Sequence, residues 1–257
     1  MATPRLGAMR TLVLVATIAL TAACRARRAA DAPMEMSAAD TTDQGASAAA
    51  HDAMTGPMSG DPHLQLTPAH APTASDTARA ADLVAEMRTG LAKYRDVHVA
   101  ESDGFRPFLP GVQQPIYHFT NNRWALEAMF GFNAGKPTSL LYRQEPDGKF
   151  VLLGVMYTAP ARASLDELER RIPLGVARWH EHVNWCVPPA GQRERWRETR
   201  DGAPVFGPQS PIASAAACAA VGGRFLPRIF GWMVHVMAFE SDDPKVIWGG
   251  GHDHRHS

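Results

Sequence analysis

The sequence is short of cysteine and carries no excess of charge of either sign. Only three cysteines occur in 257 residues, so their positions matter more than their number. Lysine plus arginine equals aspartate plus glutamate at 26 each, which gives a formal net charge of zero. Proteins that bind nucleic acid favour a basic face that neutralises phosphates. The balance of charge therefore gives no reason to expect a nucleic acid among the partners.

A long N-terminal segment lacks almost every side chain that builds a core. Residues 25–77 contain no valine, isoleucine, phenylalanine, tyrosine or tryptophan, and their only leucines are Leu64 and Leu66. Such a segment buries too little apolar surface to offset the entropy lost on ordering. The composition predicts a disordered tether over 24–77, a globular domain over 78–248, and a flexible histidine-rich tail over 249–257.

Residues 1–23 have the features of an export signal. Arg5 and Arg10 supply positive charge, residues 12–20 are apolar, and small residues precede Cys24. The apolar run is too short to cross a bilayer, which takes about 20 residues. We therefore expect a signal peptide that is removed on export.

Cys24 is the expected site of lipid attachment. Residues 20–24, Leu-Thr-Ala-Ala-Cys, resemble a bacterial lipobox, with Leu20 one position earlier than usual and Thr21 in its place. This predicts a lipid-anchored protein of the cell envelope that faces the periplasm or the exterior. The alternative is a signal peptide that is cleaved without lipidation.

Export also bears on the other two cysteines. With Cys24 at the mature N-terminus, Cys186 and Cys218 remain as a pair in an oxidising compartment, where a disulfide is the simplest outcome. Two buried thiols are the alternative.

The pattern of elements over 78–248 indicates a β-rich α+β domain with an antiparallel sheet and a few peripheral helices. Apolar spacing predicts a helix from a cap at 75–77 to about 103, and Ser164 with Glu167 forms a capping box for a second one. Ser210-Pro211 predicts the start of a third helix, which Gly222-Gly223 closes. Strands are predicted at 115–120, 138–143, 149–158, 175–186, 230–239 and 245–248, with a hairpin turn at 146–148.

Two histidines share a predicted strand in the segment Trp179-His180-Glu181-His182. Successive strand residues face opposite ways, so His180 and His182 lie on one face together with Cys186, and Glu181 lies on the other. Two histidines at this spacing can converge on a metal ion. The segment is not the helical zinc-protease motif, which would need a histidine where Asn184 stands.

A second candidate strand carries soft ligands. Met233, His235 and Met237 alternate along 231–237 and share one face, and thioether with imidazole suits Cu(I) better than hard cations. His118 is the candidate fourth histidine. The sequence predicts one metal site, for copper or zinc, from His180, His182, His235, His118, Met233 and Met237. Structural histidines and filler methionines are the alternative.

Three functions remain open at this level. The first is a metal-binding lipoprotein whose tail histidines, His252, His254 and His256, add weak metal binding. The second is an envelope enzyme, either a metal-dependent hydrolase or oxidase, or a cofactor-free one using His180 and Glu181. The third is a non-catalytic binding module, with an unknown protein partner.

The motifs together resemble a known group. Trp179-His180-Glu181-His182 with Cys186, and 231–236, Gly-Trp-Met-Val-His-Val, are similar to motifs of a group of uncharacterised exported bacterial proteins. Residues 94–96 and 117–119 share the likeness, which covers roughly residues 90–248. The resemblance implies that these motifs occur together, and it implies no activity.

Overall fold

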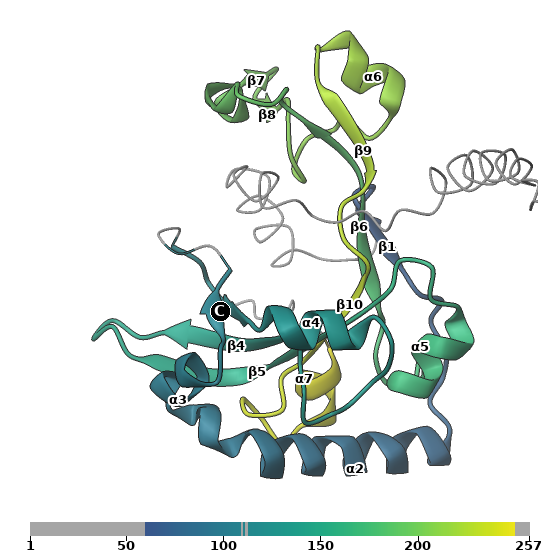
Figure 1. Cartoon of the computed structure of the whole chain (residues 1–257). Coiled ribbons are helices and arrows are strands. Elements are labelled where there is room, and N and C mark those ends of the chain that lie inside the picture. The colour runs from purple at the N-terminus through teal and green to yellow at the C-terminus, as the bar shows by residue number, and fades with distance from the viewer. Residues whose placement is uncertain (1–59, 109, 111–112, 250–257) are drawn as a thin grey trace, which may run out of the picture. The chain divides into compact units, whose positions relative to one another are not determined.

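The computed structural model describes residues 60–108, 110 and 113–249 (Figure 1). Within them the chain forms an eight-stranded antiparallel sheet with helices around it, which confirms the predicted α+β class. The expected signal peptide, Cys24, most of the expected tether and the tail histidines lie outside the described residues. No helix among those described is long and apolar enough to span a membrane.

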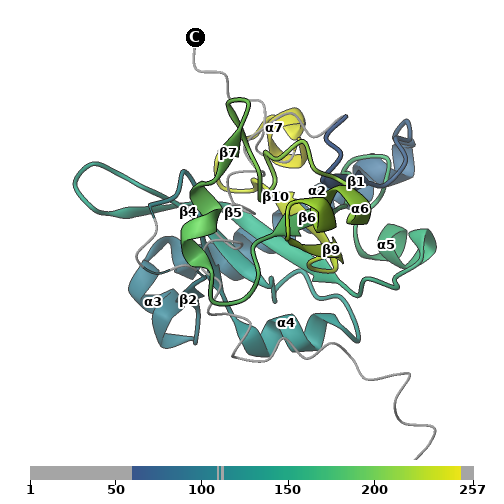
Figure 2. The ribbon, with the colours of Figure 1, turned by 90° about the horizontal axis from the view of Figure 1, so that it is seen from above.

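The sheet runs in the order β1-β6-β10-β5-β4-β3-β2, and β9 pairs with the far part of β6 (Figures 1 and 2). All pairs in it are antiparallel. Its strands are β1 Leu64–Leu66, β2 Arg106–Pro107, β3 Tyr117–Thr120, β4 Ser139–Gln144, β5 Phe150–Ala159, β6 His180–Val187, β9 Arg224–Arg228 and β10 Trp232–Val236. A separate two-stranded ribbon joins β7 Thr199–Arg200 to β8 Ala203–Pro204.

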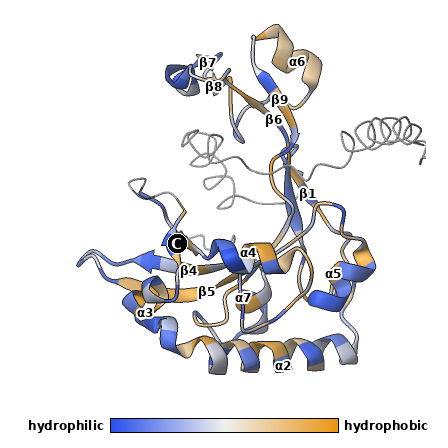
Figure 3. Cartoon of the chain, in the orientation of Figure 1, coloured by the Kyte–Doolittle hydropathy of each residue, from blue (hydrophilic) through white to orange (hydrophobic). Residues whose placement is uncertain are grey.

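One face of the sheet packs on the main apolar core. Val84, Met87 and Leu91 of the long helix α2 are buried in that core with Val155 of β5 and Val234 of β10. Figure 3 shows the alternation of polar and apolar residues along α2 that this one-sided burial requires. The helices are α2 Ala74–Leu91, α3 Val97–Ser102, α4 Asn122–Ala128, α5 Leu165–Arg171, α6 Ala215–Ala220 and α7 Pro244–Trp248.

The predicted capping box of α5 is confirmed, and α2 has one that the sequence reading did not identify. Ser164 caps α5 with Glu167 as its reciprocal partner. In α2 the cap is Thr73, two residues before the predicted range, because Asp76 completes the capping box with it. The predicted continuous helix is also interrupted, since Asp96 takes an extended backbone and caps α3 instead.

The hairpin prediction is confirmed between β4 and β5. The Glu145 and Lys149 backbones bond across the turn, and Gly148 has a φ of 86°, which favours glycine. Strands at 117–120, 139–144, 150–159 and 232–236 agree with prediction apart from their ends.

The predicted tether is wrong over its last residues. Leu64–Leu66 forms β1 on the edge of β6, and the ring of the buried His63 lies within hydrogen-bonding distance of two carbonyl oxygens, Asn184 O at 3.0 Å and Ser210 O at 2.6 Å. The average composition of residues 24–77 did not predict this three-residue strand, because its partner strand lies more than 110 residues later in the chain.

Three further element predictions are wrong. Residues 245–248 form the end of helix α7 rather than a strand, because Asp243 caps it and Pro244 occupies the first turn. Helix α6 begins after Ser214, while the Ser210 hydroxyl bonds within its own turn to Val205 O and Ile212 N. Strand β6 begins at His180, five residues after the predicted start.

Candidate metal centre

The predicted ligands lie on the face of the sheet opposite the main core. His118 is on β3, His180 and His182 are on β6, and His235 is on β10. Their exposed fractions are 6%, 2%, 1% and 5%, so all four imidazoles are buried. Three methionines pack in an apolar cluster on this face: Met156, Met233 and Met237.

The register places a methionine beside two of these histidines. His235 on β10 is directly opposite Met156 on β5, and His180 on β6 is directly opposite Met233 on β10. Directly opposed residues in an antiparallel pair share a face, with Cβ atoms about 4.5–5.5 Å apart. Met237 follows His235 by two residues, just beyond the end of β10.

The four imidazoles form a row. The ring centroids of His118 and His235 are 5.3 Å apart, those of His235 and His180 are 5.3 Å apart, and those of His180 and His182 are 5.8 Å apart. His118 Nε2 and His235 Nε2 are 3.4 Å apart. Two nitrogens bound to one tetrahedral metal at about 2.0–2.1 Å lie about 3.4 Å from each other, so this pair has the spacing of two ligands.

The contact between His118 and His235 requires the sheet to curve. Strands β3 and β10 are separated by β4 and β5, which would place them about 14 Å apart in a flat sheet. Their imidazole nitrogens nevertheless meet, so the histidine and methionine face is concave. The register of the β4–β5 pairing shifts between Leu141 and Tyr142, and an irregularity of this kind bends and twists a strand locally.

His182 lies at the end of the row among aromatic rings. Its ring centroid is 5.5 Å from that of Trp185 and 6.2 Å from that of Phe230. The predicted alternation placed Trp185 on the opposite face, and it is wrong beyond Val183. Asn184 has a φ of 59°, which breaks the two-residue period of the strand.

No group of three or more histidine, cysteine, aspartate or glutamate side chains that could hold a metal is found among the described residues. The row therefore offers a pair of histidines at ligand spacing, and a further soft ligand there would be methionine sulfur. The convergent pair on this face is His118 and His235, with His180 next in the row and Met156 and Met233 opposed to the histidines.

No family model, curated protein or solved structure matches the chain. The resemblance of the histidine motifs to exported bacterial proteins therefore stays a prediction.

Glu181 does not share the face of His180. Its fully buried carboxylate forms an ion pair with Arg228 of β9, at 3.0 Å from Nη2. Burial raises the pKa of Glu181, and the charge of Arg228 opposes that shift. Because neighbouring strand residues face opposite ways, the hypothesis of a cofactor-free His180–Glu181 dyad loses its geometric basis.

Met156 is the residue that sequence reasoning missed. It lies within the expected strand 149–158, but its alternation there matches that of any half-buried strand, so nothing local distinguished it from a core residue. Only the pairing of β5 with β10 shows that it is opposite His235. A methionine in register with a candidate ligand cannot be identified before strand order is known.

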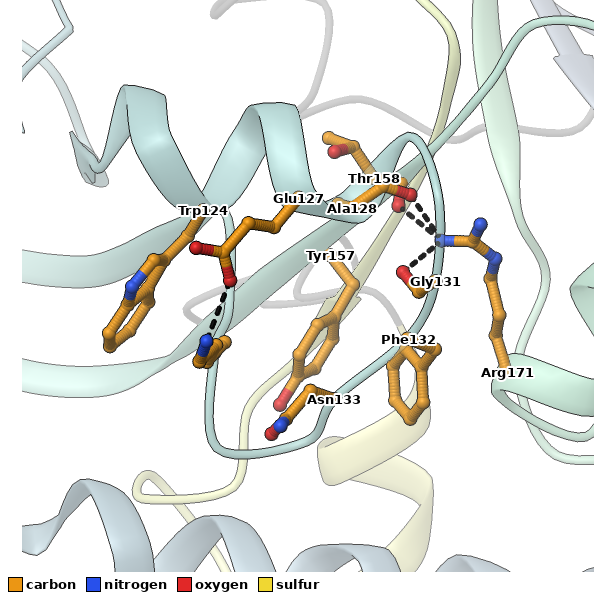
Figure 4. A pocket seen from close by; sticks show the side chains of 10 residues that line it. Trp124, Glu127, Ala128, Gly131, Phe132, Asn133, Tyr157, Thr158 and Arg171 are labelled. Atoms are coloured by element: carbon orange, nitrogen blue, oxygen red, sulfur yellow. Dashed lines mark hydrogen bonds and ion pairs between the residues drawn. The ribbon is translucent and has the colours of Figure 1, made fainter.

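A surface pocket of about 200 Å³ lies away from the histidines, beside α4 (Figure 4). Glu127 accepts from Lys136 there, and the buried Tyr157 donates to Ala134 O. Burial raises the pKa of Tyr157 well above its ordinary value. Arg171 closes one end by donating to three backbone carbonyls, including Ala128 O at 2.8 Å. Its hydrogen bonds to the backbone give Arg171 a structural role.

The predicted disulfide between Cys186 and Cys218 is present. Their Cα atoms are 5.4 Å apart, and the bond joins the end of β6 to helix α6. Gly223 packs directly on it, since a Cβ there would lie 2.8 Å from Cys218 Sγ and from a ring carbon of Phe206. The bridge lies at the far end of β6 from His180, so it holds that strand without taking part in the histidine row.

Proposed function

We propose that this protein binds a transition metal, with copper favoured over zinc, through the convergent pair His118 and His235. Methionine sulfur completes the ligand set, and His180 lies next in the row. The observation that carries the proposal is the 3.4 Å separation of His118 Nε2 and His235 Nε2, two residues 117 positions apart in the chain. His182 extends the row, and Met233 and Met237 flank it.

Burial and strand positions support this function. Ligands on paired strands are held before the metal arrives, so binding costs little ordering entropy. The exposed fractions of 2–6% at His118, His180 and His235 mean that a bound ion would exchange its water shell for protein ligands. We propose further that Cys24 carries a lipid and that the domain works in the cell envelope.

The test measures metal content in the full chain with His252, His254 and His256 replaced by asparagine, so that the tail cannot bind metal. Dialysis against copper or zinc followed by elemental analysis should find about one ion per chain. His118→Ala and His235→Ala should each reduce the content to background. His98→Ala is the matched control, because the His98 side chain is 84% exposed and pairs only with Glu101.

Two results would contradict the proposal. One is a tail-substituted chain that binds neither copper nor zinc above background. The other is stoichiometric metal in folded His118→Ala and His235→Ala proteins. Circular dichroism of each variant shows whether it has folded, and a metal-induced rise in melting temperature of the unsubstituted site gives a readout that needs no variant.

A further inference from the structure

The methionines on the histidine face bear on which ion the site takes. Resting on the proposed metal function, we infer that the site selects Cu(I), with Met156 and Met233 as sulfur ligands or immediate neighbours of the ion. The sequence pattern did not point to Met156, and the register places it directly opposite His235.

The positions of the methionines place sulfur beside the histidines. Met156 on β5 lies directly opposite His235 on β10. Met233 lies two residues before His235 in the chain, and Met237 lies two residues after it. His180 has Met233 directly opposite. A thioether is therefore in register beside His235 of β10 and beside His180 of β6.

Methionine sulfur is a soft ligand. Thioether sulfur binds Cu(I) and adds little for zinc, which prefers imidazole, thiolate and carboxylate. Two imidazole nitrogens at ligand spacing with one or two methionine sulfurs give the low coordination number that Cu(I) accepts.

The charge of the ion also decides how well it fits a buried site. The side chains that cluster with the methionines are apolar, namely Leu141, Leu153, Ile116 and Phe230, and the Glu181 carboxylate is paired with Arg228. The desolvation cost of an ion scales with the square of its charge, so a bare divalent cation costs about four times as much as a monovalent one of equal size. A buried site of neutral ligands favours the monovalent ion.

Burial of the methionines keeps water away from the proposed site. Met156, Met233 and Met237 have exposed fractions of 8%, 6% and 1%. Excluding water keeps a bound Cu(I) from the polar environment that stabilises the divalent state. Methionines exposed at the surface would leave a bound Cu(I) in contact with water.

The experiment compares Cu(I) and Zn(II) affinity in the full chain with the tail histidines replaced by asparagine. Cu(I) is supplied under anaerobic reducing conditions in competition with bicinchoninate, and Zn(II) in competition with a chromophoric chelator. Met156→Leu and Met233→Leu keep the side-chain volume, so both should fold. Each should weaken Cu(I) binding about 10- to 100-fold and leave Zn(II) binding within about threefold.

Met87→Leu is the matched control, since Met87 is fully buried in the main core on the opposite face. It should change neither affinity. X-ray absorption of the Cu(I) form should show a sulfur shell that weakens in the Met156→Leu and Met233→Leu proteins.

The outcomes separate the two levels of the proposal. If His118→Ala and His235→Ala remove metal while both methionine variants keep full Cu(I) affinity, metal binding stands and the Cu(I) inference fails. Equal losses of Cu(I) and Zn(II) affinity would also reject it. A wild-type protein that binds neither Cu(I) nor Zn(II) would overturn both the metal-binding proposal and the Cu(I) inference.

Discussion

At the scale of single residues, short hydrogen bonds decide where helices start. Thr73 and Asp76 satisfy each other's backbone N–H at the start of α2, with Asp76 Oδ2 accepting from Thr73 N at 2.8 Å. These bonds favour the ionised carboxylate, so they lower the pKa of Asp76, chiefly through the Thr73 backbone. A carboxyl with a lowered pKa stabilises the fold above its ordinary range near 3.8 and loses that contribution as pH falls through the lowered value.

The cap can be tested by titration. NMR of the side-chain carboxyls should find Asp76 titrating below its ordinary pKa. Thr73→Ala removes the side-chain bond and keeps the backbone N–H, so it should raise the pKa of Asp76 only part of the way. Glu167, whose pKa the Ser164 cap of α5 lowers in the same way, is the internal control and should not move. An Asp76 carboxyl that titrates normally in the unsubstituted protein would contradict this account.

At the scale of elements, periodicity predicted most strands but neither their partners nor their irregularities. The alternation in 231–237 correctly placed Met233 and His235 on one face, because β10 is regular. The alternation in 180–186 failed at Asn184, since a positive φ depends on the surroundings of that residue. Strand β1 was missed because three residues carry no period of their own.

The candidate site was likewise predicted only in part, because its local features can be read from the sequence and its long-range features cannot. Spacing identified the residue types and the faces of His180, His182 and His235, which are local properties. The meeting of His118 with His235 and the place of Met156 depend on strand order and curvature, which are long-range. The sequence alone could therefore predict which residues are candidate ligands, but it could not predict which of them lie close together in the fold.

The attachment of β1 gives a prediction at this scale. The His63 ring links β1 to Asn184 O and to Ser210 O, two carbonyls from distant segments. His63→Ala should lower the free energy of unfolding by about 1–3 kcal/mol, because at least one buried hydrogen bond is lost. Hydrogen exchange should accelerate at the Leu64 and Leu66 amides more than in β4 and β5. His70→Ala, at an exposed position, should change neither, and equal exchange in both variants would refute the anchoring role.

At the scale of the whole domain, β6 connects the region of the histidine row to the region of the disulfide. Its first half pairs with β1 and β10 and carries His180 and His182. Its second half pairs with β9 and ends at the disulfide to α6. Asn184 separates the two halves. The histidine end is held by β1 and β10, whereas the cysteine end is held by β9 and by the covalent link to α6.

This division predicts that the disulfide stabilises the fold without supporting the metal site. Replacing both Cys186 and Cys218 with serine opens a loop of sequence separation 32 and should lower the free energy of unfolding by about 3–4 kcal/mol. Denaturant unfolding measures the loss, and thiol labelling of the unreduced, unfolded wild type should find neither cysteine free. Metal stoichiometry should stay the same under conditions where the variant is folded, because β1 and β10 still hold His180. A folded double variant that loses its metal would show instead that strain or motion at Cys186 reaches His180 along β6, and the two halves of the strand would then act as one unit.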